Sequence, residues 1–252
     1  RHERLETEVL RRADRVLAAS RTHADRLRAR FTAAGLDPAR VVHLPNGYEP
    51  SEGGAALSAA PRADAWVVAY TGTLSLMPDV GVFLEAIHDL LARLPEARRR
   101  LRARLMGPFD TGYRDRAEAL GLTGIVEFMG PRPHAEARAL QRGAGLLVHW
   151  QPREFPTMVP GKLYEYFEAG RPIVAVLDPA TEAAGLLRQS GATVVPPGDR
   201  AALSAELERH YRAWREHGPE PARIPVGLED HRRDRIATRL AVLLDQLVAV
   251  SA

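Results

Sequence analysis

Short apolar runs alternate with helix-like segments along most of the chain after residue 65. Runs of three to five residues rich in β-branched and other apolar side chains predict buried strands, and stretches with an apolar residue every three or four positions predict helices. The predicted strands are 66–70, 103–106, 125–129, 146–150, 173–177 and 193–195. The predicted helices are 80–94, 114–120, 135–141, 160–169, 182–189 and 201–216. Strands that alternate with helices favour right-handed crossovers, so the predicted fold class is α/β, a Rossmann-like parallel sheet with helices on both faces.

The two ends of the chain follow other patterns. A charge-rich helix is predicted at 1–12, a short apolar run follows at 16–19, and Ser20 can cap a helix that Gly35 stops. A second apolar run ends in the turn signal Pro45-Asn46-Gly47, so residues 1–48 are predicted as a β-α-β segment that lacks a third strand. Residues 49–64 are rich in Ala, Gly, Ser and Pro and are typical of a linker. A Pro/Gly stretch at 218–227 precedes a final helix at 230–250.

Composition narrows the function classes. The chain of 252 residues contains no cysteine, which excludes disulfides, thiolate nucleophiles and cysteine metal sites and fits a cytoplasmic location. The net charge of +3 is weak evidence for a nucleic-acid partner, and none is expected. No apolar run is long enough to span a bilayer. The chain begins at Arg1 without an initiator methionine, so a fragment of a longer protein is one interpretation.

Lys162 is the only lysine among 35 basic residues, and it lies at the predicted start of a helix. A cation is disfavoured there by the helix dipole, whereas the free N–H groups of a helix N-terminus bind phosphate. The position therefore favours an anionic ligand. The alternative is a surface residue that escaped an arginine-biased composition.

The loops after the predicted strands are the places to search for a ligand site, because ligands of such sheets bind at the carboxyl ends of the strands. The first of these loops carries Gly72 and Thr73 but matches neither a dinucleotide fingerprint nor a Walker loop. Arg153 lies in the loop at 151–159. Lys162 and Glu165 share a helix face, either as an ion pair or as joint contacts to one ligand, with the ammonium on phosphate and the carboxylate on a sugar diol.

Several motifs carry a family resemblance. The segment Pro160-Gly161-Lys162-Leu163-Tyr164-Glu165-Tyr166, followed by Ala169-Gly170-Arg171-Pro172, resembles the donor-binding signature of retaining GT-B glycosyltransferases of the sucrose-synthase-like family. The segments 13–20, 44–48, 70–72 and 126–130 agree with that family in order and spacing.

The resemblance implies a donor site. It implies that Lys162 contacts the diphosphate and that Glu165 contacts the ribose. The remaining implied contacts are Gly72 and Thr73 near the phosphates, the turn that ends at Arg132 beside the base, and the amides of Thr157, Met158 and Val159 near the donor sugar.

The sequence departs from the family pattern at two points. Thr157 stands eight residues before Glu165, where the family has a second glutamate, and Thr73 stands where the family has an arginine. We predict Arg153 as the substitute cation and, with Lys162, as a catalytic residue; a solvated loop arginine is the alternative.

The resemblance also implies a domain plan. Residues 1–48 correspond to the closing part of an acceptor-side domain, 49–64 to a linker, 65–217 to the donor-binding domain, and 218–252 to a linker with a returning helix. Most of the acceptor domain is not in the sequence.

The implied activity is transfer of a hexosyl-type sugar from a nucleotide-diphosphate donor, with retention, to a glycan, lipid or small-molecule acceptor in glycan biosynthesis. No cofactor is implied, and the absence of a D-x-D sequence fits metal-independent stabilisation of the leaving group. The arginine-rich ends at 1–15 and 231–239 are either contacts to the anionic inner face of a membrane or solvated helix faces. The alternatives are a non-catalytic nucleotide-binding or interaction module and a GT-B epimerase or phosphorylase.

Overall fold

The computed structural model describes residues 2–49, 64–75, 77 and 79–251, so most of the predicted linker at 49–64 lies outside the described residues. The chain divides into two compact units. The first comprises Arg1–Pro50, Thr157–Tyr164 and Gly227–Ala252, and the second comprises Ser51–Pro156 and Glu165–Val226. Each unit is described by itself.

The first unit contains a parallel pair of short strands, β1 (Val16–Ala18) and β2 (Val41–His43), joined through helix α2 (Arg21–Ala33). Ser20 caps α2 by accepting a hydrogen bond from the His23 N–H, as the sequence predicts. The other elements of this unit are α1 (His2–Arg12), the 3₁₀ turns η1 (Pro38–Arg40) and η4 (Leu228–His231), and α9 (Arg233–Ser251). The predicted β-α-β segment is confirmed.

The second unit is a six-stranded parallel sheet with strand order β5-β4-β3-β6-β7-β8. Its strands are β3 (Trp66–Thr71), β4 (Leu101–Met106), β5 (Val126–Gly130), β6 (Leu146–Trp150), β7 (Ile173–Val176) and β8 (Thr193–Val195). Its helices are α3 (Asp79–Arg93), η3 (Pro95–Arg99), α4 (Thr111–Ala119), α5 (His134–Gly143), α7 (Glu182–Gln189) and α8 (Arg200–His217). Helix α6 (Gly161–Ala169) begins in the first unit and enters the second at Glu165. The order reverses between β3 and β6, which is the switch point of a doubly wound sheet. The predicted fold class is confirmed.

The ends of the predicted elements agree with the observed ends to within three residues. Strand β4 shows why one of the predicted ends differs. This strand begins at Leu101, two residues before its predicted start. The predicted start is late because Arg102 interrupts the apolar pattern, and Arg104 interrupts it again. Both arginines are half-buried, whereas Leu101, Ala103 and Leu105 are buried. The strand therefore alternates between two environments, as expected when its two faces differ.

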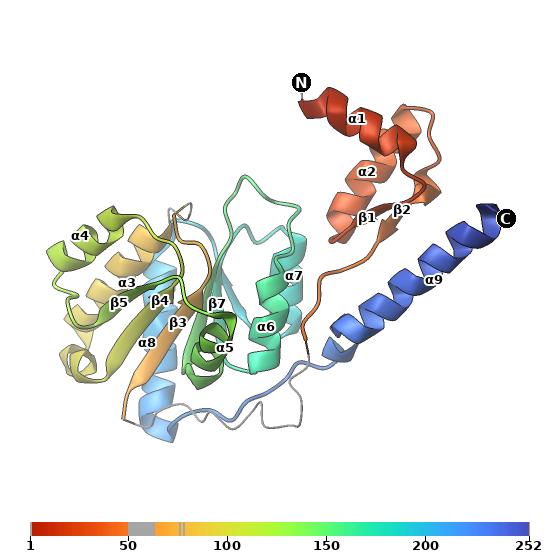
Figure 1. The fold of residues 1–252 in the computed structure, drawn as a ribbon. Helices are drawn as coiled ribbons and strands as arrows, with labels where there is room; N and C mark the ends of the chain where they lie inside the picture. Colours follow the sequence, from red (N-terminus) through yellow and green to blue (C-terminus); the bar gives the residue numbers. More distant parts are fainter. Residues whose placement is uncertain (1, 50–63, 76, 78, 252) are drawn as a thin grey trace. The chain divides into compact units, whose positions relative to one another are not determined.

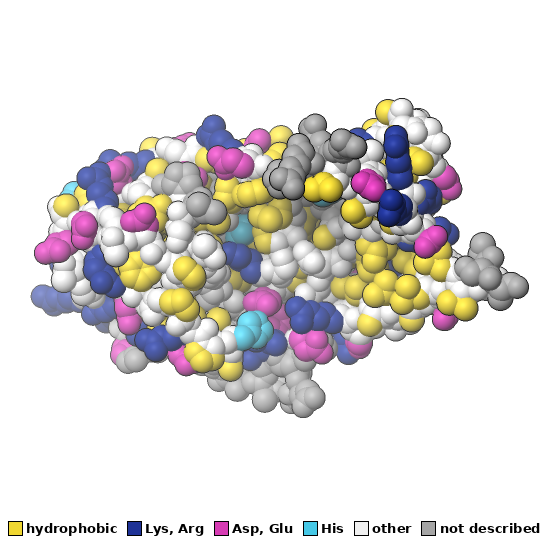
Figure 2. Space-filling model, turned by 45° about the horizontal axis from the view of Figure 1, so that its top comes forward, with side chains coloured by type: hydrophobic (Ala, Val, Ile, Leu, Met, Phe, Trp, Pro, Cys, Tyr) yellow, Lys and Arg dark blue, Asp and Glu magenta, His cyan; other side chains and the backbone are white. Residues whose placement is uncertain are grey.

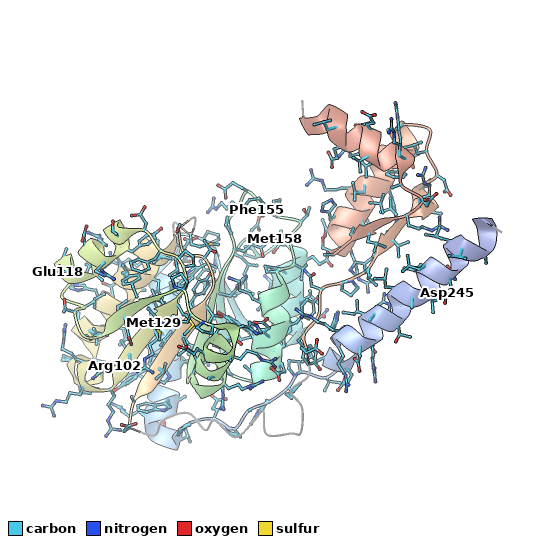
Figure 3. The ribbon with its side chains drawn as sticks, viewed as in Figure 1. Arg102, Glu118, Met129, Phe155, Met158 and Asp245 are labelled. Atoms are coloured by element: carbon cyan, nitrogen blue, oxygen red, sulfur yellow. The ribbon has the colours of Figure 1, made fainter. Side chains whose placement is uncertain are left out.

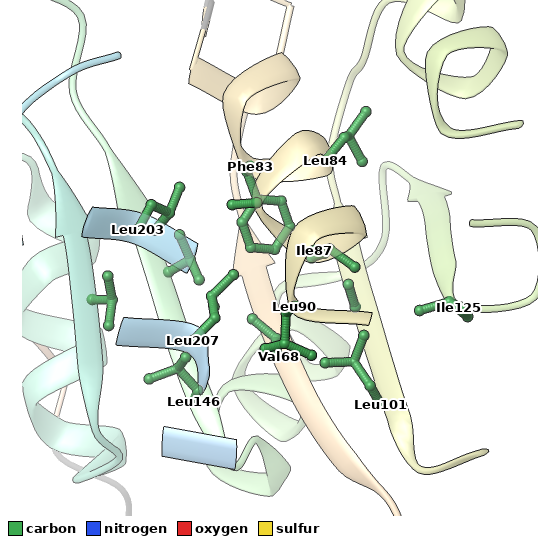
Figure 4. Packing of buried hydrophobic residues seen from close by; sticks show 14 of the residues in the cluster. Val68, Phe83, Leu84, Ile87, Leu90, Leu101, Ile125, Leu146, Leu203 and Leu207 are labelled. Carbon is green, nitrogen blue, oxygen red and sulfur yellow. The ribbon is translucent and has the colours of Figure 1, made fainter. Parts of the chain in front are cut away.

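One face of this sheet is covered by α3 and α8, which pack together. Their apolar side chains form a single core with alternate strand residues such as Val68 and Leu146 (Figure 4). The opposite face is covered by α5 and α6 (Figure 1). There the strand residues include Thr71, which bonds side chains of both helices.

Candidate functional site

Three glycines lie at the carboxyl ends of the neighbouring strands β3, β4 and β5, with Gly130 as the last residue of β5. Gly72, Gly107 and Gly130 have φ angles of 139°, 137° and 68°. A Cβ atom on Gly107 would lie 2.0 Å from the Gly72 carbonyl oxygen, so only glycine fits there. The Gly72 N–H donates to the Met106 carbonyl at 2.8 Å, and the Gly107 N–H donates to the Gly130 carbonyl at 2.9 Å. Gly107 is buried against Gly72, so the glycines let the ends of these strands pack closely, and Gly72 and Gly130 are the partly exposed backbone at this edge.

Thr73, predicted beside the phosphates, is exposed directly after Gly72. Its carbonyl oxygen accepts a hydrogen bond of 3.0 Å from the buried hydroxyl of Tyr70. Burial raises the pKa of Tyr70 far above its ordinary value, so this phenol stays neutral and keeps donating. The backbone of the loop is therefore anchored at the position where the Thr73 side chain faces solvent.

Glu165 lies in α6 with both carboxylate oxygens engaged. Its Oε1 atom lies 3.1 Å from Nε2 of His134, and its Oε2 atom accepts from the side-chain amide of Gln141 at 3.3 Å. The Glu165 side chain is 21% exposed and that of His134 is 67% exposed. A carboxylate has about four acceptor positions, so Glu165 is fixed and still has capacity to accept from a diol.

Gln141 and Thr71 join this carboxylate to the end of β3. The Gln141 amide also donates to the Thr71 hydroxyl oxygen at 2.8 Å, and the Thr71 N–H donates to the Tyr166 hydroxyl at 3.0 Å. Gln141, Thr71 and Tyr166 are all buried. Burial raises the pKa of Tyr166 to about 12, so it is a neutral phenol at ordinary pH.

Sequence reasoning missed Gln141, although a signal was present. Ala137, Gln141 and Ala144 are spaced four and three residues apart, which places them on one side of α5 and its cap. Gln141 and Ala144 are buried and Ala137 is half-buried, so a glutamine stands on the inward side of the helix. A polar residue at such a position indicates a specific hydrogen-bond partner.

Arg132 lies in the exposed turn between β5 and α5 that was predicted to lie beside the base. The turn is Pro131-Arg132-Pro133, and Pro133 fills the N-cap position of α5. Prolines on both sides restrict its backbone. Arg132 is therefore held at the same edge of the sheet as Gly130.

Lys162 stands in the first turn of α6, three residues before Glu165, as predicted. It is half-buried, and the turn is closed by a 3.1 Å bond from the Leu163 N–H to the Pro160 carbonyl. The Glu165 oxygens bond His134 and Gln141 of α5, and joint contact of Lys162 and Glu165 with one ligand stays a prediction.

The segment of Thr157, Met158 and Val159 is tied by its carbonyl groups within the first unit. The Ser20 hydroxyl donates to the Thr157 carbonyl at 2.5 Å, and the Asn46 side-chain amide donates to the Val159 carbonyl at 3.0 Å. Val159 is buried, whereas Met158 is 39% exposed (Figure 3). The two bonds fix the backbone of the segment whose amides were predicted near the donor sugar.

Arg153, predicted as a second cation, is exposed in the loop after β6. Its guanidinium donates to the Pro197 carbonyl at 3.2 Å, which joins this loop to the loop after β8. The same β6 loop is closed by a 2.9 Å bond from the Gln151 amide to the Phe155 carbonyl. The structure gives Arg153 a structural contact at the carboxyl edge, and its catalytic role stays a prediction.

Arg171, from the same sequence motif, has a structural position. It is 7% exposed, and its guanidinium donates to the carbonyls of Arg142 at 2.7 Å and Glu220 at 2.9 Å. Desolvation lowers its pKa from the ordinary value. It thereby anchors the end of α5 to the segment after α8.

Within residues 2–49, 64–75, 77 and 79–251, no group of three or more His, Asp or Glu side chains is arranged to hold a metal ion. Over the same ranges, none of the helices combines the length and the apolar character needed to cross a membrane. Basic and acidic side chains are interspersed over the face drawn in Figure 2.

Comparisons with known proteins identify the family. Residues 65–213 match the family described as glycosyl transferases group 1, so the chain belongs to this family. The D-inositol 3-phosphate glycosyltransferase of Actinosynnema mirum is 31% identical over 154 residues, which cover 55% of this chain and 36% of that protein. The chain therefore spans about a third of the length of the curated relative that it matches.

Solved structures agree in fold. The structure of HepE of Anabaena in complex with UDP superimposes with a TM-score of 0.68 at 18% identity. The match covers 93% of this chain and 64% of the HepE chain. Sucrose-phosphate synthase of Thermosynechococcus elongatus gives a TM-score of 0.67 at 19% identity, over 97% of this chain and 61% of the synthase chain. At these identities the likeness establishes the GT-B type of α/β fold.

Proposed function

We propose that this chain, as a member of the group 1 glycosyl transferases, binds the nucleoside diphosphate of a sugar donor and takes part in transfer of the sugar to an acceptor hydroxyl. The observation that carries the proposal is the constellation at the carboxyl edge of the sheet. The partly exposed backbone of Gly72, an oriented carboxylate at Glu165 and the lysine of the same helix supply the contacts that phosphates and a ribose diol require.

In the proposed reaction, the bond between the anomeric carbon and the diphosphate oxygen breaks, and a bond to the acceptor oxygen forms while the acceptor loses its proton. The difficult step is the departure of the charged diphosphate. Lys162 and the positive end of the α6 helix dipole supply positive charge where negative charge develops. Arg153 is the proposed second cation, and Thr73 and Arg132 are the proposed phosphate and base contacts.

The finer features belong to the same proposal. We propose a hexosyl donor, retention of configuration, stabilisation of the leaving group without a metal ion, and no cofactor besides the donor itself. UDP is the first nucleotide to test, because HepE, which shares the fold, was solved with UDP. The acceptor is a glycan, lipid or small molecule, and the predicted site of action is the cytoplasm, with the arginine-rich ends against the inner face of a membrane.

The domain plan is also a proposal. Residues 65–217 form the donor-binding domain, 1–48 the closing part of an acceptor-side domain, and 218–252 the returning segment. In the first unit, Ser20 and Asn46 hold the carbonyls of Thr157 and Val159, which supports a structural role for 1–48 beside the donor-sugar segment.

Calorimetric titration of the chain with UDP, GDP and dTDP tests the proposal. One of these nucleotides should bind, and Lys162→Ala should weaken it about 100-fold because a charge-assisted contact to phosphate is lost. Glu165→Ala should weaken it about 30-fold through loss of the ribose contact.

Glu206→Gln on α8 is the matched control. Its carboxylate is 24% exposed, close to the 21% of Glu165, and it pairs with Arg209 away from the carboxyl edge. The control should bind nucleotide as the parent does. Absence of binding by all three nucleotides at millimolar concentration would rule out the donor site and leave the interaction module as the better interpretation.

A further inference from the structure

We propose that Gln141 is a positioning residue of the donor site. Its side-chain amide holds the Glu165 carboxylate in one orientation and ties it to the strand end that carries Gly72. The inference rests on the proposed function, in which Glu165 accepts hydrogen bonds from the ribose diol.

The chemistry of the partners fixes how the Gln141 amide is oriented. Its nitrogen lies 2.8 Å from the Thr71 hydroxyl oxygen and 3.3 Å from the Glu165 Oε2 atom. An ionised carboxylate only accepts hydrogen bonds, so the NH₂ group rather than the carbonyl must face Glu165. The two amide protons then serve two acceptors that are 94 residues apart in the sequence.

Packing alone does not require a glutamine at this place. Gln141 is 2% exposed on the inward side of α5, where Ala144 is completely buried and Ala137 is half-buried. An apolar side chain of the same length would bury without any polar cost. What the glutamine adds is a directional contact in a low-dielectric environment, where a satisfied hydrogen bond is strong and specifies one geometry.

The second partner of Glu165 is a weaker constraint. His134 is 67% exposed at the start of α5, so water competes for its contact with the carboxylate. Without Gln141, the Glu165 side chain regains rotamer freedom that binding must then remove. Nucleotide affinity should therefore depend on Gln141, which acts through its hydrogen bonds to Glu165 and Thr71.

The network also joins two parts of the site. Thr71 accepts from Gln141 and donates its N–H to Tyr166, and Gly72 follows Thr71 directly. The backbone that approaches the phosphates and the carboxylate that receives the ribose are thus held by one buried set of hydrogen bonds. A shift at one contact is transmitted to the other.

The test combines protein variants with ligand variants. We compare UDP with its 2′,3′-dideoxy analogue, which lacks the diol, on the parent chain and on Gln141→Met; if GDP is the tighter ligand, the guanosine pair is used. The Met side chain keeps the length of Gln and removes both donors. Relative to the parent, we expect Gln141→Met to bind UDP about tenfold more weakly and to change the affinity for the dideoxy analogue by less than about twofold.

The outcomes separate the two proposals. If the parent chain binds no nucleotide, or binds UDP and the dideoxy analogue equally, the ribose contact of Glu165 is wrong and the positioning role falls with it. The parent can prefer UDP while Gln141→Met weakens the binding of UDP and of the dideoxy analogue by the same factor, or leaves both affinities unchanged. In either case the donor site stands and the positioning role of Gln141 is overturned.

A second variant covers the case in which Gln141→Met does not fold. Thr71→Val keeps the shape of the side chain and removes the acceptor that orients Gln141, so UDP should bind about threefold more weakly with the same dependence on the diol. Unchanged UDP affinity in Thr71→Val would contradict the network. Ser204→Ala on α8 is the control, because it removes a buried hydroxyl that bonds the Ala86 carbonyl far along the other face.

Discussion

The two faces of the six-stranded sheet share the same strands and differ in the side chains that they bury. On the α3–α8 face, the buried strand residues are aliphatic or aromatic, for example Val68, Leu105 and Val148. On the α5–α6 face, the buried residues include Thr71 and His149 from the strands and Gln141 and Glu168 from the helices. One face supplies apolar burial, and the other supplies directed polar contacts.

The difference indicates which face of the sheet can determine ligand specificity. Apolar burial is non-directional, so the α3–α8 face stabilises the sheet mainly without directed contacts, the buried Ser204 and Tyr70 hydroxyls being exceptions. Buried polar groups need defined partners, so the α5–α6 face fixes the positions of the few groups that a ligand would read. Variants on the first face should therefore change stability alone, and variants on the second should change stability and affinity separately.

The largest effect is expected from Phe83→Ala on α3. Phe83 is completely buried, and its ring meets that of Trp150 edge-on at 5.3 Å. The free energy of unfolding measured in urea should fall by about 4 kcal/mol, because a large cavity is left behind. UDP affinity of the folded variant at low temperature should stay within twofold of the parent. A tenfold loss there would show that the two faces are not independent.

Glu168→Ala tests whether the polar face also contributes to stability. Glu168 is 6% exposed. Its carboxylate lies 2.9 Å from the guanidinium of Arg138 and 3.1 Å from that of Arg142. Removal of the carboxylate leaves two part-buried cations, so the free energy of unfolding should fall by about 3 kcal/mol. Glu206→Ala leaves Arg209, whose side chain is 55% exposed and can be solvated, so it should cost less than about 1 kcal/mol. An equal cost for both variants would contradict the burial argument.

Acidification should weaken the α8 side of the sheet through His210. Burial first and the neighbouring Arg209 second lower the pKa of His210 to about 4, and an Arg209 guanidinium nitrogen lies 2.9 Å from its Nε2 atom. The unfolded chain then binds the extra proton between pH 6.5 and 4, so stability is complete above pH 6.5 and falls as pH decreases through this window.

His210→Gln isolates this contribution. Between pH 7 and 5 the parent should lose up to about 2 kcal/mol more than the variant, measured by urea unfolding at each pH. Burial also lowers the pKa of His231, so the variant keeps part of the slope. The carboxylates of Glu85 and Glu208, whose pKa values are lowered by arginine hydrogen bonds, act at still lower pH. Identical slopes in parent and variant would refute the assignment.

The smallest effect is expected from His134→Ala. The side chain is 67% exposed and shares one hydrogen bond with Glu165. Its loss should change the free energy of unfolding by less than about 0.5 kcal/mol and UDP affinity by less than about threefold. A tenfold loss of affinity would mean that the exposed contact, rather than the buried one from Gln141, orients the carboxylate.

Local rules predicted the elements and several of their ends. Gly170, directly after the lysine helix, has the left-handed φ of 65° that favours glycine at a helix end, and a Cβ atom there would lie 2.9 Å from the Arg223 nitrogen. Ser20 caps its helix as expected. The placement of Lys162 and Glu165 on one helix also followed from their spacing. Each of these features depends on residues within a few positions along the chain.

The buried network escaped prediction because its partners are distant in sequence. Gln141 and Thr71 are 70 residues apart, and Thr71 and Tyr166 are 95 residues apart. A threonine at the end of a strand and a glutamine in a helix are ordinary residues locally. Their meaning depends on the packing of α5 and α6 on the same face of the sheet.

The sequence by itself determined the alternation of strands and helices, the α/β class and the helix that carries Lys162 and Glu165, since periodicity, caps and turns are local properties. The tertiary structure alone decided which face became polar and which side chain orients Glu165. The physical reason is that the cost of a buried polar group is set by partners from other elements, and those partners meet only when the sheet and its helices have assembled.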